Sequence, residues 1–324
     1  MKTLSFDKTG DPKEVLAFIE KEIPRPGDKE VLIKVSGSPV HPADGFFING
    51  TYRFKPAFPW QTAGLEGAGI IEAAGKKTRL ATGTLVAFDA REAWSQYVVV
   101  PEESVVALPA DFPPDKAVQF FLNPFTAWGL LEESKVQAGE WLLLTAANST
   151  VSRLVMQLAK LRDINVIAAV RNLKQTGELK KLGADVVVNA EDEQFSEQVN
   201  AITSGEGINA ALDAVGGGAG TKILQNMAAG GRIIIYGLLS KDPVRFFNAQ
   251  VIYKNLELKG FGVRGFLQRQ PEVERVEMTR TLVEEIAKPS FALPVAEAFS
   301  LEQFKEALAA DGHPHRKGKI IFKP

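Results

Sequence analysis

From residue 141 onward, short apolar segments alternate with amphipathic ones, and this alternation constrains the fold more than any other feature of the chain. Residues 141–146 (WLLLTA) are apolar almost throughout, as expected for a strand buried on both faces. Residues 153–162 then place leucine and valine at helical spacing. Repeated units of this kind predict a parallel sheet covered by helices. Further strands are predicted at residues 166–170, 185–188, 209–214 and 232–236 and in LELKGF.

The residues before Gln119 have a different pattern, with short strand-like segments interrupted by glycine and proline. These segments are EVLIKVSGS, GAGIIEAAG, TLVAF and WSQYVVVP. After Gly262 the sequence predicts a helix near 272–286, a proline-bounded strand, a helix in LEQFKEALAA and a final strand in KIIF. A chain of 324 residues exceeds the usual size of one hydrophobic core. We therefore expect a β-rich domain over 1–120, a nucleotide-binding domain over 121–261, and a segment over 262–324 that completes the first domain.

The composition excludes several classes of function. A net charge of -1 gives no positive field that would attract nucleic acid or anionic lipid. The N-terminus lacks an apolar signal segment, and no stretch of about 18 apolar residues follows. Because the chain has no cysteine, it has no disulfide, thiol nucleophile or cysteine-bound zinc. We expect a cytoplasmic protein without nucleic-acid or membrane partners and without a metal site, with His313 and His315 solvated in a polar loop.

The turn after the first strand of the parallel sheet, AANSTVS, is the candidate phosphate site. A helix N-terminus attracts anions, because its free backbone N–H groups and its dipole both point at the ligand. The usual dinucleotide fingerprint places glycines here, so that the backbone approaches the pyrophosphate. This turn has none, although Ser149 and Thr150 offer hydroxyl donors. The turn is therefore either a phosphate site of unusual sequence or an ordinary connection between a strand and a helix.

The residue after the second predicted strand bears on which dinucleotide is bound. An acidic residue commonly stands there and accepts hydrogen bonds from the adenosine ribose. Arg171 stands there instead, and a guanidinium group pairs with the 2′-phosphate that an acid would repel. Lys174 adds a second cation. This pattern favours NADP over NAD, unless Arg171 is simply an exposed residue at the start of a loop.

Four segments together resemble a known family. They are SPVHPADGFFINGTYRFKPAFPWQTAGLEGAGIIEAAG, then NPFTAW, then MAAGGRIIIYGLL followed by LELKGF, and finally RKGKIIF. In order and spacing they resemble the zinc-free medium-chain dehydrogenases/reductases, and the resemblance covers nearly the whole chain. It implies an α/β protein with a Rossmann doubly wound parallel sheet domain, a β-rich GroES-like catalytic domain and a homodimeric assembly.

Within that family, the segments INGTY, NPFTAW and IYGLL and the Asn-Ser of AANSTVS are most similar to the corresponding segments of the 2-enoyl thioester reductases. The NADPH:quinone oxidoreductases are the near alternative. The resemblance implies that Tyr52 is a catalytic or substrate-orienting group and that Thr126, the second catalytic candidate, lies near the nicotinamide with Asn123. It also implies an NADPH site formed by Asn123, Asn148, Ser149, Thr150, Val151, Arg171, Lys174, Tyr236, Gly237 and Lys319.

The chain departs from the family at several positions. Thr150 and Ser152 stand where the family normally has glycine, and His41 stands where asparagine is usual. Gly262 stands where the enoyl reductases tend to have a tryptophan in the substrate pocket. These differences put the tightness of pyrophosphate binding and a preference for fatty chains in doubt.

The expected chemistry follows from the absence of a Lewis acid. Without one, an unactivated ketone is a poor substrate, whereas a conjugated C=C bond or a quinone is a better one. Hydride addition at the β-carbon gives an enolate, which Tyr52, with an ordinary pKa of about 10, can stabilise or protonate. The alternative is that Tyr52 is a packing residue in a loop. Likewise, Thr126 either binds the nicotinamide or caps its helix.

Three hypotheses remain open from the sequence. The first is an NADPH-dependent reductase of 2-enoyl thioesters or related conjugated carbonyls, with a small molecule as its substrate. The second is an NADPH:quinone oxidoreductase on the same fold, which the missing pocket tryptophan favours. The third is a nucleotide-binding sensor without turnover, which the glycine-free turn favours.

Overall fold

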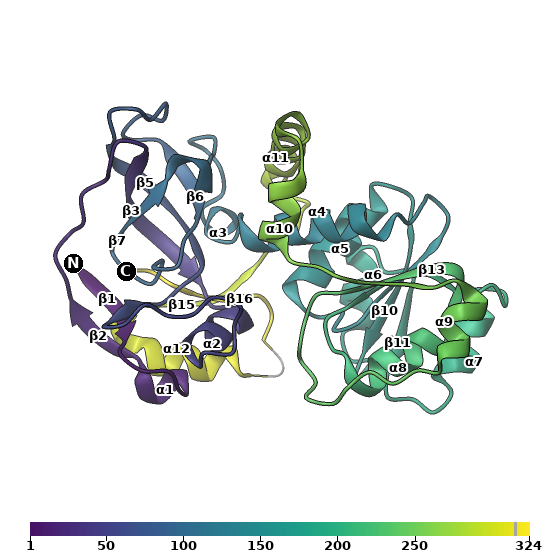
Figure 1. Cartoon of the computed structure of the whole chain (residues 1–324). Coiled ribbons are helices and arrows are strands. Elements are labelled where there is room, and N and C mark those ends of the chain that lie inside the picture. Colours follow the sequence, from purple (N-terminus) through teal and green to yellow (C-terminus); the bar gives the residue numbers. More distant parts are fainter. Residues whose placement is uncertain (314–315) are drawn as a thin grey trace. The chain divides into compact units, whose positions relative to one another are not determined.

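A computed structural model describes residues 1–313 and 316–324 of the chain (Figure 1). The chain divides into two compact units. Residues 1–122 and 279–324 form the first unit, and residues 123–278 form the second. Strands and helices are both abundant, so the expected α/β class is confirmed. We also predicted domain limits at 120/121 and 261/262. The division into compact units does not test these limits, which stay a prediction.

The second unit contains a sheet of six strands in the order β11-β10-β9-β12-β13-β14, and its neighbouring strands are parallel. Numbered within the unit, the order is 3-2-1-4-5-6, that of the doubly wound dinucleotide-binding sheet. The strands predicted from residue 141 onward are confirmed, including the sixth. Their bounds are β9 (Trp141–Leu144), β10 (Asn165–Val170), β11 (Val186–Asn189), β12 (Ile208–Asp213), β13 (Met227–Ile235) and β14 (Glu257–Gly260).

Helices follow each of the first strands of this sheet and cover it (Figure 1). The core brings Leu143, Ile167 and Ala211 from three strands together with Phe195 and Leu224 from two helices. Burial of these apolar side chains is the main source of the unit's stability. The helices are α4 (Leu122–Ser134), α5 (Thr150–Lys160), α6 (Thr176–Leu182), α7 (Phe195–Ile202), α8 (Gly217–Gln225), α9 (Asn248–Lys254), α10 (Val263–Arg269) and the start of α11 (Glu272–Ala287).

The first unit contains a seven-stranded sheet and a three-stranded sheet. In the larger one the order is β15-β16-β3-β5-β6-β8, with β7 also paired to β3. The smaller sheet has the order β2-β1-β4. The strands are β1 (Lys2–Phe6), β2 (Ala17–Glu20), β3 (Glu30–Pro39), β4 (Gln61–Thr62), β5 (Glu66–Ala74), β6 (Leu85–Asp89), β7 (Tyr97–Pro101), β8 (Val105–Ala107), β15 (Val295–Phe299) and β16 (Lys319–Phe322).

The last strand returns to the middle of the larger sheet, where β16 pairs antiparallel with the end of β3. Its residues Ile320 and Phe322 pack in the same core as Phe6, Phe47 and Trp94. The end of the chain thus supplies part of the core of the first unit. The helices and 3₁₀ turns of this unit are α1 (Pro12–Val15), α2 (Pro42–Ile48), η1 (Glu102–Ser104), α3 (Pro114–Ala117), η2 (Leu301–Gln303) and α12 (Phe304–Asp311).

The helices predicted near 272–286 and in LEQFKEALAA are confirmed as α11 and α12. Within the two described ranges, no helix combines the length and the apolar character needed to cross a bilayer.

Candidate active site

A buried carboxylate organises the carboxyl ends of the central strands in the second unit. Asp213 ends β12, and its Oδ1 accepts the hydroxyl of Thr145 at 2.9 Å. The same oxygen accepts the backbone N–H groups of Val215 at 2.9 Å and Gly216 at 3.1 Å. Gly216 has a φ of +77°, a conformation that glycine adopts without strain. Asp213 therefore fixes the turn at the place where doubly wound sheets bind ligands.

The turn after β9 is ordered by two serines. Ser149 is the N-cap of α5, and its hydroxyl accepts the backbone N–H of Ser152 at 3.2 Å. The hydroxyl of Ser152 donates to the carbonyl of Thr145 at 3.2 Å and lies 3.4 Å from the hydroxyl of Tyr236. Ser152 is buried, so its side chain is accommodated inside the unit. The lack of glycine at this position is thus compatible with a turn that leads directly into a helix N-terminus.

Two residues after β13 complete this edge of the sheet. Burial raises the pKa of Tyr236, so its hydroxyl stays protonated beside the serines. A Cβ atom added to Gly237 would lie 2.4 Å from the carbonyl oxygen of Ala214. Only glycine allows the backbone to approach β12 so closely. The structure therefore brings the predicted residues Ser149, Tyr236 and Gly237 to one edge of one sheet.

The remaining predicted residues of this edge lie on its surface. Arg171 follows β10 directly, and both Arg171 and Lys174 are exposed. Within the described part of the chain, neither side chain forms a hydrogen bond or an ion pair, so both cations are available to an anion. Asn148 is exposed, and Thr150 and Val151 are half-buried in the first turn of α5.

Asn123 and Thr126 lie in the first turns of α4. Asn123 is 7% exposed, and its Nδ2 has no hydrogen-bond partner among the described residues. A buried donor without a partner is costly, so a ligand acceptor would satisfy it. Thr126 is half-buried one turn inside a helix that begins at Leu122. The alternative that Thr126 caps the helix is therefore wrong, because a cap stands at the helix start.

In the first unit, three ionisable side chains form a buried cluster. Nε2 of His41 lies 2.5 Å from Oε1 of Glu66, and Nδ1 of His41 lies 3.0 Å from the ammonium group of Lys319. Lys319 also donates to the carbonyl of Val40 at 2.7 Å. All three ionisable residues are buried, at 6% exposure or less. The ammonium group of Lys319 is thus engaged within its own unit, and its expected cofactor contact stays a prediction.

The cluster has perturbed proton affinities. Burial and the nearby Lys319 lower the pKa of His41, so the imidazole is neutral at pH 7. Burial lowers the pKa of Lys319 to about 8. A lysine has only N–H donors, so Nδ1 of His41 accepts from Lys319 and Nε2 carries the ring proton. That proton then points to Oε1 of Glu66, which lies 2.5 Å from Nε2.

Tyr52 follows α2 and is held by it, since its backbone N–H donates to the carbonyl of Phe46 at 2.9 Å. Its ring packs against the core of the first unit and meets Phe54 edge-on at 5.7 Å between ring centroids. The side chain is half-buried. The ordered ring agrees with the alternative that Tyr52 is a packing residue. Its incomplete burial agrees with a role in orienting the substrate.

The other aromatic and histidine residues are distributed differently. Trp94 and Phe47 are fully buried core residues, whereas Trp60 is 43% exposed. Among the described residues, no group of three His, Cys, Asp or Glu side chains is arranged to hold a metal ion. His313 is exposed, and His315 lies outside the described residues.

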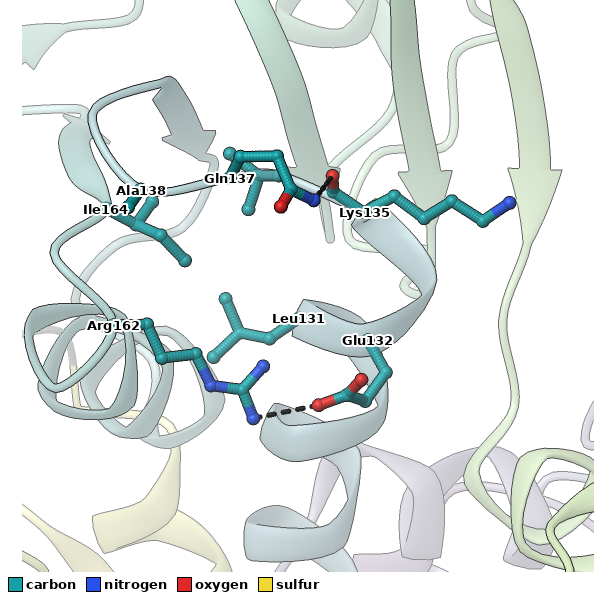
Figure 2. A pocket seen from close by; sticks show the side chains of 8 residues that line it. Leu131, Glu132, Lys135, Gln137, Ala138, Arg162 and Ile164 are labelled. Carbon is teal, nitrogen blue, oxygen red and sulfur yellow. Dashed lines mark hydrogen bonds and ion pairs between the residues drawn. The ribbon is translucent and has the colours of Figure 1, made fainter.

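A surface hollow of about 440 Å³ lies in the second unit, at the opposite end of the parallel strands (Figure 2). It is crossed by an ion pair of 2.8 Å between Arg162 and Glu132. None of the predicted site residues lines it, and we assign it no role. The lining residues are Leu131, Glu132, Lys135, Val136, Gln137, Ala138, Arg162 and Ile164.

Comparisons with known proteins agree with this arrangement. Residues 27–110 match the model of the alcohol dehydrogenase GroES-like domain, and residues 150–280 match that of the zinc-binding dehydrogenases. The mitochondrial enoyl-[acyl-carrier-protein] reductase of Xenopus tropicalis is 31% identical over 98% of this chain and 94% of its own length. The chain belongs to the medium-chain dehydrogenase/reductase family. The expected GroES-like domain and Rossmann domain are confirmed by this membership.

Other proteins are similar over the whole or nearly the whole of this chain. The human mitochondrial enoyl-[acyl-carrier-protein] reductase is 29% identical over 99% of this chain and 88% of its own. A crystal structure from Bacillus thuringiensis, provisionally named an NADPH:quinone reductase, has a TM-score of 0.92 at 28% identity, covering 100% of this chain and 98% of its own. The quinone oxidoreductase of Escherichia coli complexed with NADPH has a TM-score of 0.90 at 23% identity over 100% of both chains, which supports the fold alone.

Sequence reasoning missed two buried carboxylates of this medium-chain protein. Asp213 was part of a predicted strand without a function, and Glu66 was part of a glycine-rich motif without one. Glu66 is the first residue of β5 and Asp213 is the last residue of β12, and both are buried, where an ionisable side chain is unusual unless it has partners. That position is the signal that would have singled them out.

Proposed function

We propose that this protein is an NADPH-dependent, zinc-independent reductase of an activated C=C bond, in a 2-enoyl thioester or a related conjugated carbonyl. The observation that carries the proposal is the ordered edge of the parallel sheet, where Ser149, Tyr236 and Gly237 meet beside two unpaired cations. The enoyl-[acyl-carrier-protein] reductases similar over nearly the whole chain support the choice of substrate.

The residues at this edge fit a 2′-phosphorylated dinucleotide. The first backbone N–H groups of α5 and the hydroxyl of Thr150 would hold the pyrophosphate. Arg171 and Lys174, exposed and unpaired within the described residues, would hold the 2′-phosphate. The unpartnered Nδ2 of Asn123 would donate to the nicotinamide amide. Each of these contacts uses a group that the protein itself leaves unsatisfied or exposed.

When bound, the nicotinamide would supply a hydride for the β-carbon of the substrate. This chain's own part is to orient the carbonyl and to stabilise the enolate that develops on it. The hydroxyl of Tyr52 would donate to that oxygen or deliver the proton to the α-carbon. The ring is ordered by Phe54 and by the end of α2, so the hydroxyl is held in a narrow range of positions.

The second candidate is an NADPH:quinone oxidoreductase. It is supported by the similarity to the Bacillus thuringiensis structure and by Gly262, which has no side chain where the enoyl reductases tend to have a tryptophan. A quinone accepts hydride on oxygen and needs less help with proton delivery. The two candidates therefore differ mainly in their dependence on Tyr52.

Steady-state oxidation of NADPH tests the proposal directly. The purified protein is given crotonyl-CoA, a short enone or a benzoquinone as the acceptor. We expect kcat/KM to be highest with crotonyl-CoA, whereas a preference for the benzoquinone would favour the second candidate. Titration of NADPH by fluorescence is the parallel measurement. Tight binding without turnover of any acceptor would support the sensor hypothesis, and absence of binding would reject all three.

We also propose that the protein is a homodimer, as the family resemblance implies. The support is an exposed apolar surface on the second unit, around α9 and the edge strand β14. Exposed apolar patches of this kind commonly mark interfaces, and an unpaired edge strand invites pairing. Sedimentation of the wild type and of Tyr253→Glu tests it, with a shift toward monomer expected in the variant. The exposed apolar side chains of this surface are Leu238, Phe247, Ile252, Tyr253 and Leu258.

A cytoplasmic location stays part of the proposal. Its support is the sequence alone, since the enoyl reductases compared above are named mitochondrial. Fractionation of the source cells is the direct measurement.

A further inference from the structure

The contact between His41 and Glu66 joins the starts of two helices. His41 is the N-cap of α2, the helix whose last turn holds the backbone of Tyr52. Oε2 of Glu66 accepts the backbone N–H groups of Phe121 and Leu122, at 2.9 and 2.7 Å, where α4 begins. A carboxylate at this place satisfies amides that a helix start leaves without partners and interacts favourably with the helix dipole.

These two helices carry residues that the proposed function uses. Tyr52 follows α2 after a short turn, and Asn123 and Thr126 lie in the first turns of α4. Glu66 is 0% exposed, so water does not compete for the hydrogen bonds that its carboxylate accepts. One buried side chain therefore bonds to the first amides of α4 and to the ring of the residue that precedes α2.

Lys319 determines how His41 is used in this arrangement. It reaches the cluster from β16, and its ammonium group is anchored by the carbonyl of Val40. By donating to Nδ1, it leaves the Nε2 proton of His41 for Glu66. Without that donor, Nδ1 would lose its partner, and Glu66 alone would hold the proton on Nε2. The opposite tautomer would set a bare nitrogen against a carboxylate oxygen at 2.5 Å, which is repulsive.

We propose that Lys319, His41 and Glu66 form a positioning relay, in which Lys319 and Glu66 together set the tautomer of His41, and His41 holds Glu66 on the first amides of α4. In this role Lys319 is a positioning residue, in place of the cofactor contact that the family resemblance implies. The functional consequence rests on the proposed reductase activity, because it concerns the placement of Tyr52, Asn123 and Thr126. The tautomer of His41 does not depend on that activity.

The first test is the protonation of His41 in the full-length protein, measured by ¹⁵N NMR with labelled histidine. Only three histidines contribute, at positions 41, 313 and 315. We expect His41 to be neutral at pH 7, with the proton on Nε2 and a bare Nδ1. In Lys319→Met the neighbouring positive charge is gone, so the pKa of His41 should rise and more imidazolium should be seen at a given pH than in the wild type. An imidazolium, or a proton on Nδ1 in the wild type, would overturn the relay.

The second test separates positioning from general stability. His41→Asn keeps an acceptor for Lys319 and a donor for Glu66, whereas His41→Leu keeps neither. With crotonyl-CoA and NADPH, we expect kcat to fall about tenfold in His41→Leu and to stay within about threefold of the wild type in His41→Asn. Equal kcat values for the two variants would overturn the proposal.

A matched control accounts for lost stability. The hydroxyl of Ser5 is buried and lies 3.0 Å from the hydroxyls of both Thr3 and Thr62. Among the residues that the structure describes, none of these three forms a side-chain hydrogen bond with α2 or α4. Ser5→Ala should lower the melting temperature and leave kcat unchanged. If Ser5→Ala lowers kcat as much as His41→Leu at a similar loss of melting temperature, the relay is structural only.

Failure of the proposed function gives a different result. In that case the wild type itself would turn over none of the three acceptors. The NMR experiment would still decide the tautomer, and NADPH affinity measured by fluorescence would still compare His41→Leu with His41→Asn. An unchanged affinity in both variants, together with the wrong tautomer, would reject the relay independently of activity.

Discussion

The backbone N–H of His41 donates to Oδ2 of Asp44 at 2.7 Å, while Oδ1 of the same carboxyl group has no partner among the described residues. Asp44 is 1% exposed, and burial raises its pKa to about 8. The His41 amide and Lys319 oppose this rise, whereas Glu66 and Asp311 add to it. Asp44 therefore carries a proton at neutral pH in the folded protein.

This proton makes stability depend on pH. Between pH 4 and 8 the folded chain holds a proton on Asp44 that the unfolded chain has lost, so the free energy of unfolding falls as pH rises, by at most about 1.4 kcal/mol per pH unit. The contribution is fully present below the ordinary pKa of 3.8 and lost as pH passes 8. His41 acts in the opposite direction below its ordinary pKa, because its folded pKa is lowered.

Comparison with Asp44→Asn isolates the carboxyl group, since the amide still accepts from the His41 backbone and the other groups are retained. We expect the stability difference, variant minus wild type, to grow in favour of Asp44→Asn from pH 5 to 8 in urea unfolding. A difference that does not change with pH would show that Asp44 is ionised in the folded protein.

Arg171→Ala should raise the KM for NADPH by about tenfold or more and leave the KM for NADH unchanged, because only NADPH carries the 2′-phosphate. Steady-state kinetics with both cofactors measures this. Lys180→Ala removes the same charge from an exposed position in α6 and serves as the control. A similar loss in both variants would indicate a general field effect instead of a phosphate contact.

Tyr52→Phe should lower kcat with crotonyl-CoA about a hundredfold and lower kcat with a benzoquinone much less. The phenyl ring retains the packing against Phe54, so the melting temperature should change little. Tyr97→Phe, in β7 of the same unit, is the control. Equal losses with both acceptors would contradict the role assigned to the hydroxyl.

Gly237→Ala should destabilise the second unit by about 2 kcal/mol, since the new Cβ atom would press on the carbonyl of Ala214. It should also weaken NADPH binding, because the end of β13 must move. Gly218→Ala, at a helical position with open space around it, is the matched control and should be neutral or stabilising. Thermal unfolding and NADPH titration of the two variants are the measurements.

The strands and helices of the second unit could be predicted because each is a local pattern. Trp141–Leu144 is apolar on both faces, which only a strand inside a covered sheet tolerates. The start of α5 was predicted three residues late, because its first turn carries Thr150 and Val151 instead of a further apolar repeat. The site residues were predicted from the family resemblance. That the ring of Tyr52 is ordered was seen only in the structure, where it packs against a core formed by residues far apart in the sequence.

The sequence by itself determined a parallel sheet covered by helices, the β-rich segment before it, the absence of cysteine chemistry and the cation after the second strand of the sheet. These are properties of composition and of short-range periodicity. Only the tertiary structure decided that Lys319, 278 positions from His41, lies 3.0 Å from its ring and that Glu66 caps a helix 55 residues away. Such contacts arise from long-range strand pairing, and no local pattern of residues encodes which buried charges will meet.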